Sequence, residues 1–381
     1  MNHPLRGPRI LVVLNALEMD APSRLTLPVI RELKKQNAEV AVAAWSRNGP
    51  LASSVREMNI EPEILNGSPA RLRKLLKTFN ADLAHFHLAK PIMVALPLTR
   101  WFSPKTRTVI TNHGTHELAE KGRLRAAVST CWFPKAAAVA DAIINVSSYE
   151  ESNLIALGIS ETRQKVIYNG IPQKFFEAQR DQSARSQLIN DHFSEVDKTD
   201  LILIGCAGNL RKVKNHETLL DAIKAAGKDT NFALIIWGEG PERENLLTKI
   251  ATLNLSDRVV LAGQSPHLEK LMPSLDMFIQ PSLHESFGMA LAEALACGIP
   301  SIAAHSGAMP EIIPPDFQQW LFPPNAADVL ATKIVELAES PSGRVNYSTT
   351  ARAWAVGHFT EQHMVSETLA CYTSLLAGSR P

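Results

Sequence analysis

Two glutamates, Glu285 and Glu293, have a type and spacing that could bind the hydroxyl groups of a ligand. Eight residues make a little over two helical turns, so groups at this spacing return to roughly the same face of a helix. A Phe-Gly step between them opens an apolar helical run, which places the first acid in the loop before the helix and the second inside the helix. The amides and the dipole of a helix start favour a phosphate. The segment therefore predicts a binding site for a ligand that has sugar hydroxyls on both sides of a diphosphate. The alternative is an ordinary amphipathic helix.

A second group of charges follows the predicted strand Leu201–Ala207. Gly208 permits a tight turn after this strand, and cations that include Arg211 and Lys214 then precede a helix predicted to start near Asn215. Cationic side chains beside a helix start form a diphosphate site. An ordinary basic loop is the alternative for this segment taken alone.

His113 directly follows the predicted strand Arg107–Asn112. Ligands of doubly wound sheets bind at the carboxyl ends of the strands, so His113 is predicted to contact a ligand, with a satisfied loop histidine as the alternative. The turn framed by Gly238 and Gly240 lacks the third glycine of a dinucleotide fingerprint, which disfavours a nicotinamide cofactor. The sequence offers no convincing set of metal ligands and no Gly-x-Ser-x-Gly elbow. We therefore expect no metal site and no hydrolytic serine.

Short β-rich runs alternate with helical stretches in both halves of the chain, which predicts parallel sheets with helices on both faces. The predicted strands of the first half are Arg9–Leu14, Glu39–Trp45, Asp82–His87, Arg107–Asn112, Ala142–Val146 and Lys165–Tyr168. Those of the second half are Leu201–Ala207, Phe232–Trp237, Arg258–Ala262, Asp276–Gln280 and Pro300–Ala304. The polar stretch Gln173–Asp200 is predicted to be a linker, and the tail Arg344–Leu376 has a helical pattern.

Length and composition agree with this division into two domains. A chain of 381 residues exceeds one ordinary core. The apolar run Ile10–Leu17 is too short to span a bilayer and is predicted to be a strand. The cysteines form no C-x-x-C pair, which argues against zinc and disulfides and indicates a reducing, cytoplasmic compartment: Cys131, Cys206, Cys297 and Cys371.

The net charge of +1 conceals a basic first half. Residues 1–180 carry 24 Lys and Arg against 15 Asp and Glu, whereas the remainder carries 15 against 23. Basic residues mixed with aromatic residues suit an anionic membrane surface or a lipid-linked substrate, with solvated helix faces as the alternative. Nucleic acid is disfavoured because no binding motif accompanies the charge. The basic clusters are Arg71–Lys77, Arg100 with Lys105 and Arg107, and Lys121–Arg125.

Taken in order, these segments resemble the retaining glycosyltransferases of the group 1 type with the GT-B fold, the E-x7-E family known as glycosyltransferase family 4. The resemblance covers nearly the whole chain, and its most specific part is the block from Glu285 to Glu293. It runs through His113-Gly114, Asn169-Gly170-Ile171, Gly208 to Asn215, Gly238-x-Gly240-Pro241, Glu285 to Glu293 and Pro310-Glu311.

The resemblance implies a role for each matching residue. Glu293 would hold the ribose hydroxyls of a nucleotide sugar, Glu285 would lie by the donor sugar, and Lys214 would neutralise the diphosphate. His113 would contact the donor sugar from the opposite domain. The implied catalytic residues are His113, Arg211, Lys214 and Glu285, and the implied donor-binding residues are Gly208, Asn209, Gly238, Glu285, Ser286, Phe287, Gly288, Met289 and Glu293.

The chain departs from the family pattern at two places. Asn209 stands where relatives often carry arginine, so Arg211 is expected to supply the second cation. The first strand is followed by no Gly-Gly pair, so we expect a differently shaped acceptor or phosphate loop with Asn15 and Arg24 as its candidate contacts.

The resemblance implies a fold and an activity together. The fold is α/β GT-B: an acceptor-binding Rossmann-like domain over residues 1–180, a nucleotide-sugar-binding one over 181–355, a cleft between them, and a C-terminal helix, 356–381, that returns to the first domain. The activity is hexosyl transfer with retention of anomeric configuration, from a UDP-sugar in preference to a GDP-sugar, to a glycan or lipid-linked acceptor. The nucleotide sugar would be a co-substrate, and neither metal nor cofactor would be required.

We expect a role in bacterial envelope polysaccharide or lipopolysaccharide synthesis, in the cytoplasm or peripherally on the inner face of the membrane. The alternatives are a nucleotide-sugar epimerase or a glycan phosphorylase of the same architecture, or a non-catalytic nucleotide-binding partner of another transferase.

Overall fold

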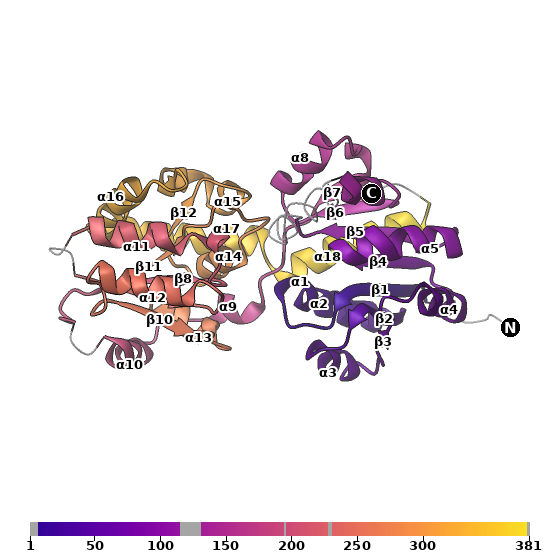
Figure 1. Cartoon of the computed structure of the whole chain (residues 1–381), viewed down its shortest axis with the longest axis horizontal. Coiled ribbons are helices and arrows are strands. Elements are labelled where there is room, and N and C mark those ends of the chain that lie inside the picture. The colour runs from indigo at the N-terminus through magenta and orange to yellow at the C-terminus, as the bar shows by residue number, and fades with distance from the viewer. Residues whose placement is uncertain (1–6, 115–130, 194–195, 228–230, 379–381) are drawn as a thin grey trace. The chain divides into compact units, whose positions relative to one another are not determined.

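The computed structural model describes residues 7–114, 131–193, 196–227 and 231–378. Contacts divide the chain into two units, residues 1–170 with 361–381 and residues 171–360 (Figure 1). The chain thus passes from the first unit to the second at Gly170–Ile171 and returns at Thr360–Glu361, whereas the sequence predicted changes near residues 180 and 355.

The first unit is built on a parallel sheet of seven strands in the order β3-β2-β1-β4-β5-β6-β7. The strand order reverses between β1 and β4, which is the topological switch point where doubly wound sheets bind ligands. The sequence did not predict β3, which has only two residues. The strands are β1 Arg9–Ala16, β2 Glu39–Arg47, β3 Glu63–Ile64, β4 Leu83–His87, β5 Arg107–Asn112, β6 Ala142–Asn145 and β7 Gln164–Val166.

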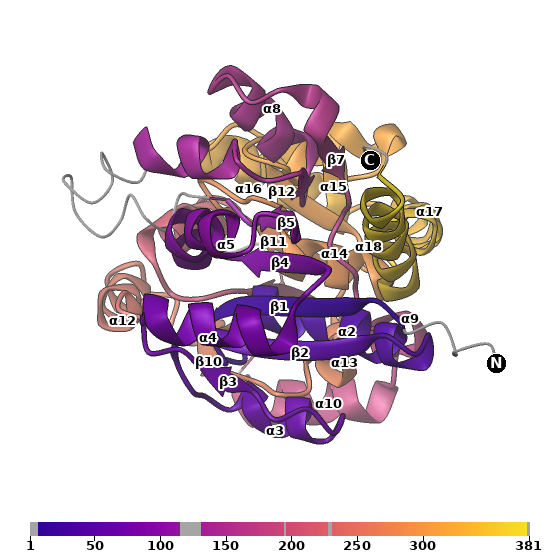
Figure 2. The same cartoon turned by 90° about the vertical axis from the view of Figure 1, so that its right-hand side faces the viewer.

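Helices cover both faces of this sheet (Figure 2). One face packs against α2, α3 and α18, and the other packs against α4, α5 and α8. Alternate residues of each strand therefore enter different cores; on β1, Val12 faces α2 and Val13 faces the opposite side. The helices are α1 Ala21–Arg24, α2 Thr26–Lys35, α3 Leu51–Arg56, α4 Pro69–Phe79, a π-helix Pro91–Ala95, α5 Leu96–Phe102, α8 Ser148–Ala156 and α18 Glu361–Leu376.

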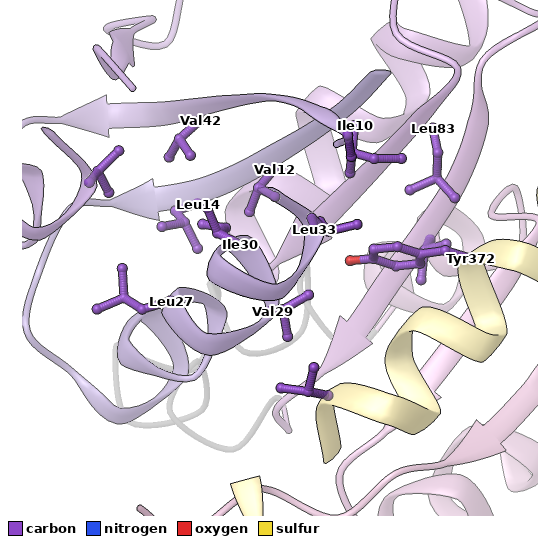
Figure 3. Packing of buried hydrophobic residues seen from close by; sticks show 14 of the residues in the cluster. Ile10, Val12, Leu14, Leu27, Val29, Ile30, Leu33, Val42, Leu83 and Tyr372 are labelled. Atoms are coloured by element: carbon purple, nitrogen blue, oxygen red, sulfur yellow. The ribbon is translucent and has the colours of Figure 1, made fainter. Parts of the chain in front are cut away.

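The last helix, α18, completes the core of the first unit although it follows the second unit in sequence. It packs beside α2, and Tyr372 lies among the buried side chains that line the sheet (Figure 3). Met364, Val365 and Leu375 are buried in the same cluster. The apolar stripe of α18 is thus the reason that the tail returns to the first sheet.

The second unit is built on a parallel sheet of six strands in the order β10-β9-β8-β11-β12-β13. The sequence did not predict the two-residue strand β13. The strands are β8 Ile202–Ala207, β9 Phe232–Trp237, β10 Val259–Gly263, β11 Met277–Gln280, β12 Ser301–Ala304 and β13 Leu321–Phe322. The helices are α9 Gln173–Glu177, α10 Gln182–His192, α11 His216–Ala225, α12 Arg243–Thr252, α13 Leu268–Leu271, α14 Met289–Ala296, α15 Met309–Ile312, α16 Ala327–Ala338 and α17 Pro341–His358.

One prediction about an irregular segment needs correction. The stretch Gln173–Asp200, predicted as a linker, contains α9 and α10, and the buried Arg185 of α10 binds Asp276 with Nη2 2.7 Å from Oδ2. The tail Arg344–Leu376, predicted to be helical, lies in α17 and α18, and the chain changes unit between these two helices. Among the described residues, no helix combines the length and the apolar character needed to cross a membrane.

Candidate active site

The carboxyl edge of the second sheet brings together a cation and an acid that the sequence predicted to meet. Lys214 follows β8 and Glu285 follows β11, the neighbouring strand. The Lys214 Nζ atom lies 2.7 Å from Glu285 Oε1, which also accepts hydrogen bonds from Gln280 Nε2 at 3.0 Å and from Ser282 Oγ at 2.8 Å. Both charged side chains are mostly buried. Three donors on one oxygen hold the carboxylate in a defined place.

Backbone contacts between loops fix the position of this ion pair. The Leu283 amide donates to the Val213 carbonyl at 2.8 Å, which joins the loop after β11 to the loop after β8. The Ala308 amide donates to the Glu285 carbonyl at 2.9 Å, which joins the loop after β12 to the same segment. Backbone hydrogen bonds therefore join the loops that follow three neighbouring strands, β8, β11 and β12, at the carboxyl edge of the sheet.

The glycines at this edge let two loops touch. Gly208 has a φ of 156° and Gly238 a φ of 154°. A Cβ atom on Gly238 would lie 1.9 Å from the Gly208 carbonyl oxygen, so a side chain there would separate the loops. The side chain of Lys214 runs past Gly208, where a Cβ atom would meet its Cδ at 3.7 Å. Gly208 and Gly238, both predicted to bind the donor, thus allow the two loops to pack closely beside Lys214.

The helix that carries the second acid begins as the Phe-Gly step predicted. Gly288 caps α14 in the left-handed region, with a φ of 101°, and Glu293 lies inside the helix while Glu285 precedes it. The ring of Phe287 is buried and meets Phe359 edge-on, with ring centroids 5.6 Å apart. Phe287 thus anchors the helix start in the core, and any ligand contact from it would use its backbone. Ser286 and Met289 flank this turn.

Two further predicted donor-site residues lie on the loop after β8. Asn209 is exposed, and Arg211 caps the short 3-10 segment Lys212–Lys214 and is partly exposed. The Arg211 amide donates to the Asn209 carbonyl at 2.9 Å. The second cation is therefore within three residues of Lys214 on the same loop.

In the first unit, His113 belongs to a cluster that the sequence reading missed. His85 and His87 are two residues apart on β4, so their side chains lie on the same face of the sheet, the face that packs against α2 and α18. The His87 Nδ1 atom lies 3.2 Å from His113 Nε2. The H-x-H spacing at the end of a strand was the signal available in the sequence, because it places both imidazoles on one face next to His113.

Burial lowers the pKa of all three histidines. The pKa of His85 falls to about 3 and that of His113 to about 4 because desolvation disfavours the charged imidazole. The pKa of His87 is lowered well below its ordinary value by burial and by its two histidine neighbours. The cluster is therefore uncharged at neutral pH.

We expect the free energy of unfolding to fall as the pH is lowered from about 6.5 toward 5, because histidines of the unfolded chain take up protons near pH 6.5 while the buried ones do not. Each depressed histidine contributes a slope of about 1.4 kcal/mol per pH unit, and this stability is fully present only above pH 6.5. Urea unfolding over this range measures the slope. His85→Asn should reduce the slope by the share of one histidine, and an unchanged slope in this variant would contradict the assignment.

Asn15 and Arg24, the two residues predicted to contact a ligand after the first strand, lie in different environments. Asn15, at the end of β1, accepts a hydrogen bond on Oδ1 from Ser46 Oγ at 2.9 Å, and Arg24 is exposed at the end of α1. A local hydrogen bond between β1 and β2 thus orients Asn15, while Arg24 stands at the surface of the loop that lacks the family's glycine pair.

The predicted basic surface is partly neutralised by an acid. Arg100 Nη1 lies 3.1 Å from Asp141 Oδ2, and Arg107 Nη1 lies 3.9 Å from Asp141 Oδ1. Trp101 beside them is 80% exposed. The cluster Lys121–Arg125 lies outside the described residues. Within the described ranges, no group of three or more His, Cys, Asp or Glu side chains could hold a metal ion.

Comparisons with known proteins agree with this architecture. Residues 23–175 match the model of Glycosyltransferase Family 4, and residues 189–354 match that of Glycosyl transferases group 1. N-acetyl-alpha-D-glucosaminyl L-malate synthase of Bacillus anthracis is 24% identical over 82% of this chain and 79% of its own length. The GDP-mannose-dependent alpha-(1-6)-phosphatidylinositol dimannoside mannosyltransferase of Mycobacterium tuberculosis is 29% identical over 65% of this chain and 63% of its own length, which is under two thirds of that protein.

A solved structure supports the fold over nearly the whole chain. The Anabaena protein Alr3699/HepE, crystallised in complex with UDP, superposes with a TM-score of 0.83 at 19% identity, covering 96% of this chain and 100% of that one. The two family models follow each other along the sequence and fall on the two Rossmann-like units. The chain therefore belongs to the group 1 glycosyltransferases with the GT-B fold.

Proposed function

We propose that the chain transfers a hexose from a nucleotide-diphosphate sugar to a glycan or lipid-linked acceptor with retention of anomeric configuration. The observation that supports this best is the pair of Lys214 and Glu285, 2.7 Å apart at the carboxyl edge of the second sheet. Glu285 lies just before α14, whose amides and dipole favour a phosphate, and Glu293 lies inside that helix. Cation, helix start and two acids are the groups that a diphosphate between two sugars requires.

The chemistry that this arrangement supports is electrostatic. As the bond from the sugar to the diphosphate breaks, negative charge grows on the leaving group, and Lys214 with Arg211 and the start of α14 would stabilise it. Lys214 would then exchange its contact with Glu285 for the diphosphate, which leaves the fixed carboxylate beside the sugar. The proton of the acceptor hydroxyl would pass to an oxygen of the leaving phosphate, so that no metal ion and no covalent protein intermediate is needed.

The preferred donor is proposed to be a UDP-sugar rather than a GDP-sugar. The Anabaena protein of the same fold was crystallised with UDP, whereas the mycobacterial relative is GDP-mannose-dependent. A ligand that binds only the folded chain raises its melting temperature by mass action. Thermal shifts with UDP, GDP and ADP therefore identify the base, and a response to none of them would count against the proposal.

The acceptor is proposed to belong to envelope polysaccharide or lipopolysaccharide synthesis. The basic first half, with exposed Trp101, suits an acceptor presented at an anionic membrane surface. The first unit would then bind the acceptor and the second the donor. Sedimentation with vesicles that contain anionic lipid, compared with neutral vesicles, tests the surface attachment directly.

Product analysis separates transfer from the other activities of this architecture. Transfer yields free nucleoside diphosphate and a lengthened acceptor whose new linkage keeps the anomeric configuration of the donor, which proton NMR of the product reads directly. An altered donor sugar without transfer would indicate an epimerase, and dependence on inorganic phosphate a phosphorylase. An inverted linkage would overturn the retaining assignment alone.

Replacing Glu293 by alanine is expected to weaken donor binding by roughly ten- to a hundredfold, because a carboxylate that accepts hydrogen bonds from two ribose hydroxyls is lost. Isothermal titration with the nucleoside diphosphate measures this change. Glu244→Ala, which removes a carboxylate from the first turn of α12, is the matched control and should leave affinity unchanged. Equal affinity in the two variants would remove Glu293 from the site.

A further inference from the structure

Three imidazoles of the first unit, those of His85, His87 and His113, form one continuous chain at the ends of two neighbouring strands. The rings of His85 and His87 on β4 have centroids 4.0 Å apart. The rings of His87 and His113 are stacked at an interplanar angle of 29° with centroids 5.5 Å apart. His87 Nδ1 meets His113 Nε2 at 3.2 Å, so the two rings share one hydrogen bond.

The other end of the chain is closed by hydroxyl groups. His85 Nδ1 lies 2.5 Å from the Tyr372 hydroxyl of α18, and His85 Nε2 lies 2.7 Å from Thr111 Oγ1 on β5. Figure 3 shows the ring of Tyr372 reaching from α18 into the cluster of buried side chains. Both nitrogens of His85 are therefore engaged, and the ring against which His87 packs is locked in orientation.

The backbone after His87 is held in a costly conformation. Leu88 has a φ of 69°, in the left-handed region that a bulky residue rarely adopts. The chain then enters the π-helix Pro91–Ala95, a form that is rare and frequent at functional sites. Strain of this kind persists where the surroundings fix it, often for function.

A small cavity of about 30 Å³ borders the three histidines. It is lined in part by His85, His87 and His113 and has room for about one water molecule.

We propose that His87 is a positioning residue that fixes the tautomer and the ring orientation of His113. A neutral imidazole has one donor and one acceptor nitrogen, so the hydrogen bond between His87 Nδ1 and His113 Nε2 couples the tautomers of the two rings: the ring that donates must carry its proton on the shared nitrogen. It also leaves Nδ1 of His113 as the nitrogen that can meet a ligand. This inference rests on the proposed function and on the role that the family resemblance implies for His113, which is contact with the donor sugar.

A pair of variants separates the hydrogen bond from simple packing. His87→Asn places a polar amide where Nδ1 stood, whereas His87→Phe keeps an aromatic ring and loses the hydrogen bond. We expect His87→Phe to lower kcat roughly tenfold with UDP affinity unchanged, and His87→Asn to remain within about threefold of the parent. Nucleotide affinity should not move because the predicted nucleotide contacts are on the second unit.

A spectroscopic measurement tests the tautomer without any turnover. In the protein labelled with ¹⁵N-histidine, with His113 assigned by comparison with His113→Gln, the parent and His87→Asn should show one fixed neutral tautomer of His113. His87→Phe should show both tautomers in exchange. A mixed or charged His113 in the parent at neutral pH would overturn the proposal, even if His87→Phe does not fold.

Two combined outcomes keep this inference distinct from the proposed function. Loss of turnover in His87→Phe with the His113 tautomer unchanged would reduce His87 to a packing residue and overturn the positioning role. Absence of transfer by the parent protein with every nucleotide sugar would defeat the proposed function instead. The NMR result would still decide whether His87 sets the state of His113.

Discussion

Alanine in place of Lys214 is expected to slow turnover by on the order of a hundredfold or more, the loss typical of removing one preorganised charge that stabilises a leaving group. Lys214 is the cation in contact with Glu285, and its side chain is 22% exposed, so most of it is shielded from water. Charge in such a shielded site acts more strongly than charge in water. Single-turnover kinetics at saturating donor measures the chemical step apart from binding.

The matched control for this experiment lies on the following helix. Lys224→Ala removes the same charge from the last turn of α11, where the side chain is exposed. It should leave turnover within about twofold, since an exposed charge is screened by water and salt. Lys214→Arg should recover part of the rate by restoring the charge. Similar rates for Lys214→Ala and Lys224→Ala would remove Lys214 from the catalytic role.

Gly307→Ala is expected to lower the free energy of unfolding by about 2 kcal/mol or more and to reduce donor turnover as well. Gly307 has a φ of 55°, and a Cβ atom there would lie 2.2 Å from the carbonyl oxygen of Glu285. The loop after β12 would have to move away from the segment whose carbonyl the Ala308 amide binds. Urea unfolding measures the stability, and the transfer assay measures the displaced acid.

Alanine in place of a second glycine is expected to stabilise the protein rather than destabilise it. Gly357 lies in α17, and a Cβ atom there would meet nothing within 4 Å. Gly357→Ala should therefore raise the free energy of unfolding by about 0.5 to 1 kcal/mol, because alanine restricts the unfolded chain and favours the helix. If Gly307→Ala were as stable as the parent protein, the loop would not be pinned against Glu285 in the way described.

The sequence predicted the long elements of both sheets because their apolar runs and intervening amphipathic stretches are clear. The strands β3 and β13, of two residues each, were missed since no periodicity exists over so short a span. Helix α10 was missed because Arg185 is buried together with Leu188 and Ile189, and a buried arginine interrupts the apolar pattern that identifies a helix face. The charge of Arg185 is compensated by Asp276.

The candidate site was predictable where motif and topology coincide. The meeting of Lys214 and Glu285 follows from two loops at the ends of strands that pair in one sheet. Contacts that depend on tertiary packing were not predictable: Tyr372 and His85 are 287 positions apart, and no local pattern relates the C-terminal helix to β4. The donor roles assigned to the site residues remain predictions for the experiments above.

The late position of α18 has a consequence for how a newly made chain matures. Ribosomes complete residues 171–360 before they begin 361–376, so the second unit has all of its chain available while the first still lacks its last helix. Until then the sheet face that Met364, Tyr372 and Leu375 will cover is open to water. The first unit is therefore begun first and completed last. A nascent chain that ends within α18 would have the whole sequence of the second unit but an incomplete core in the first unit.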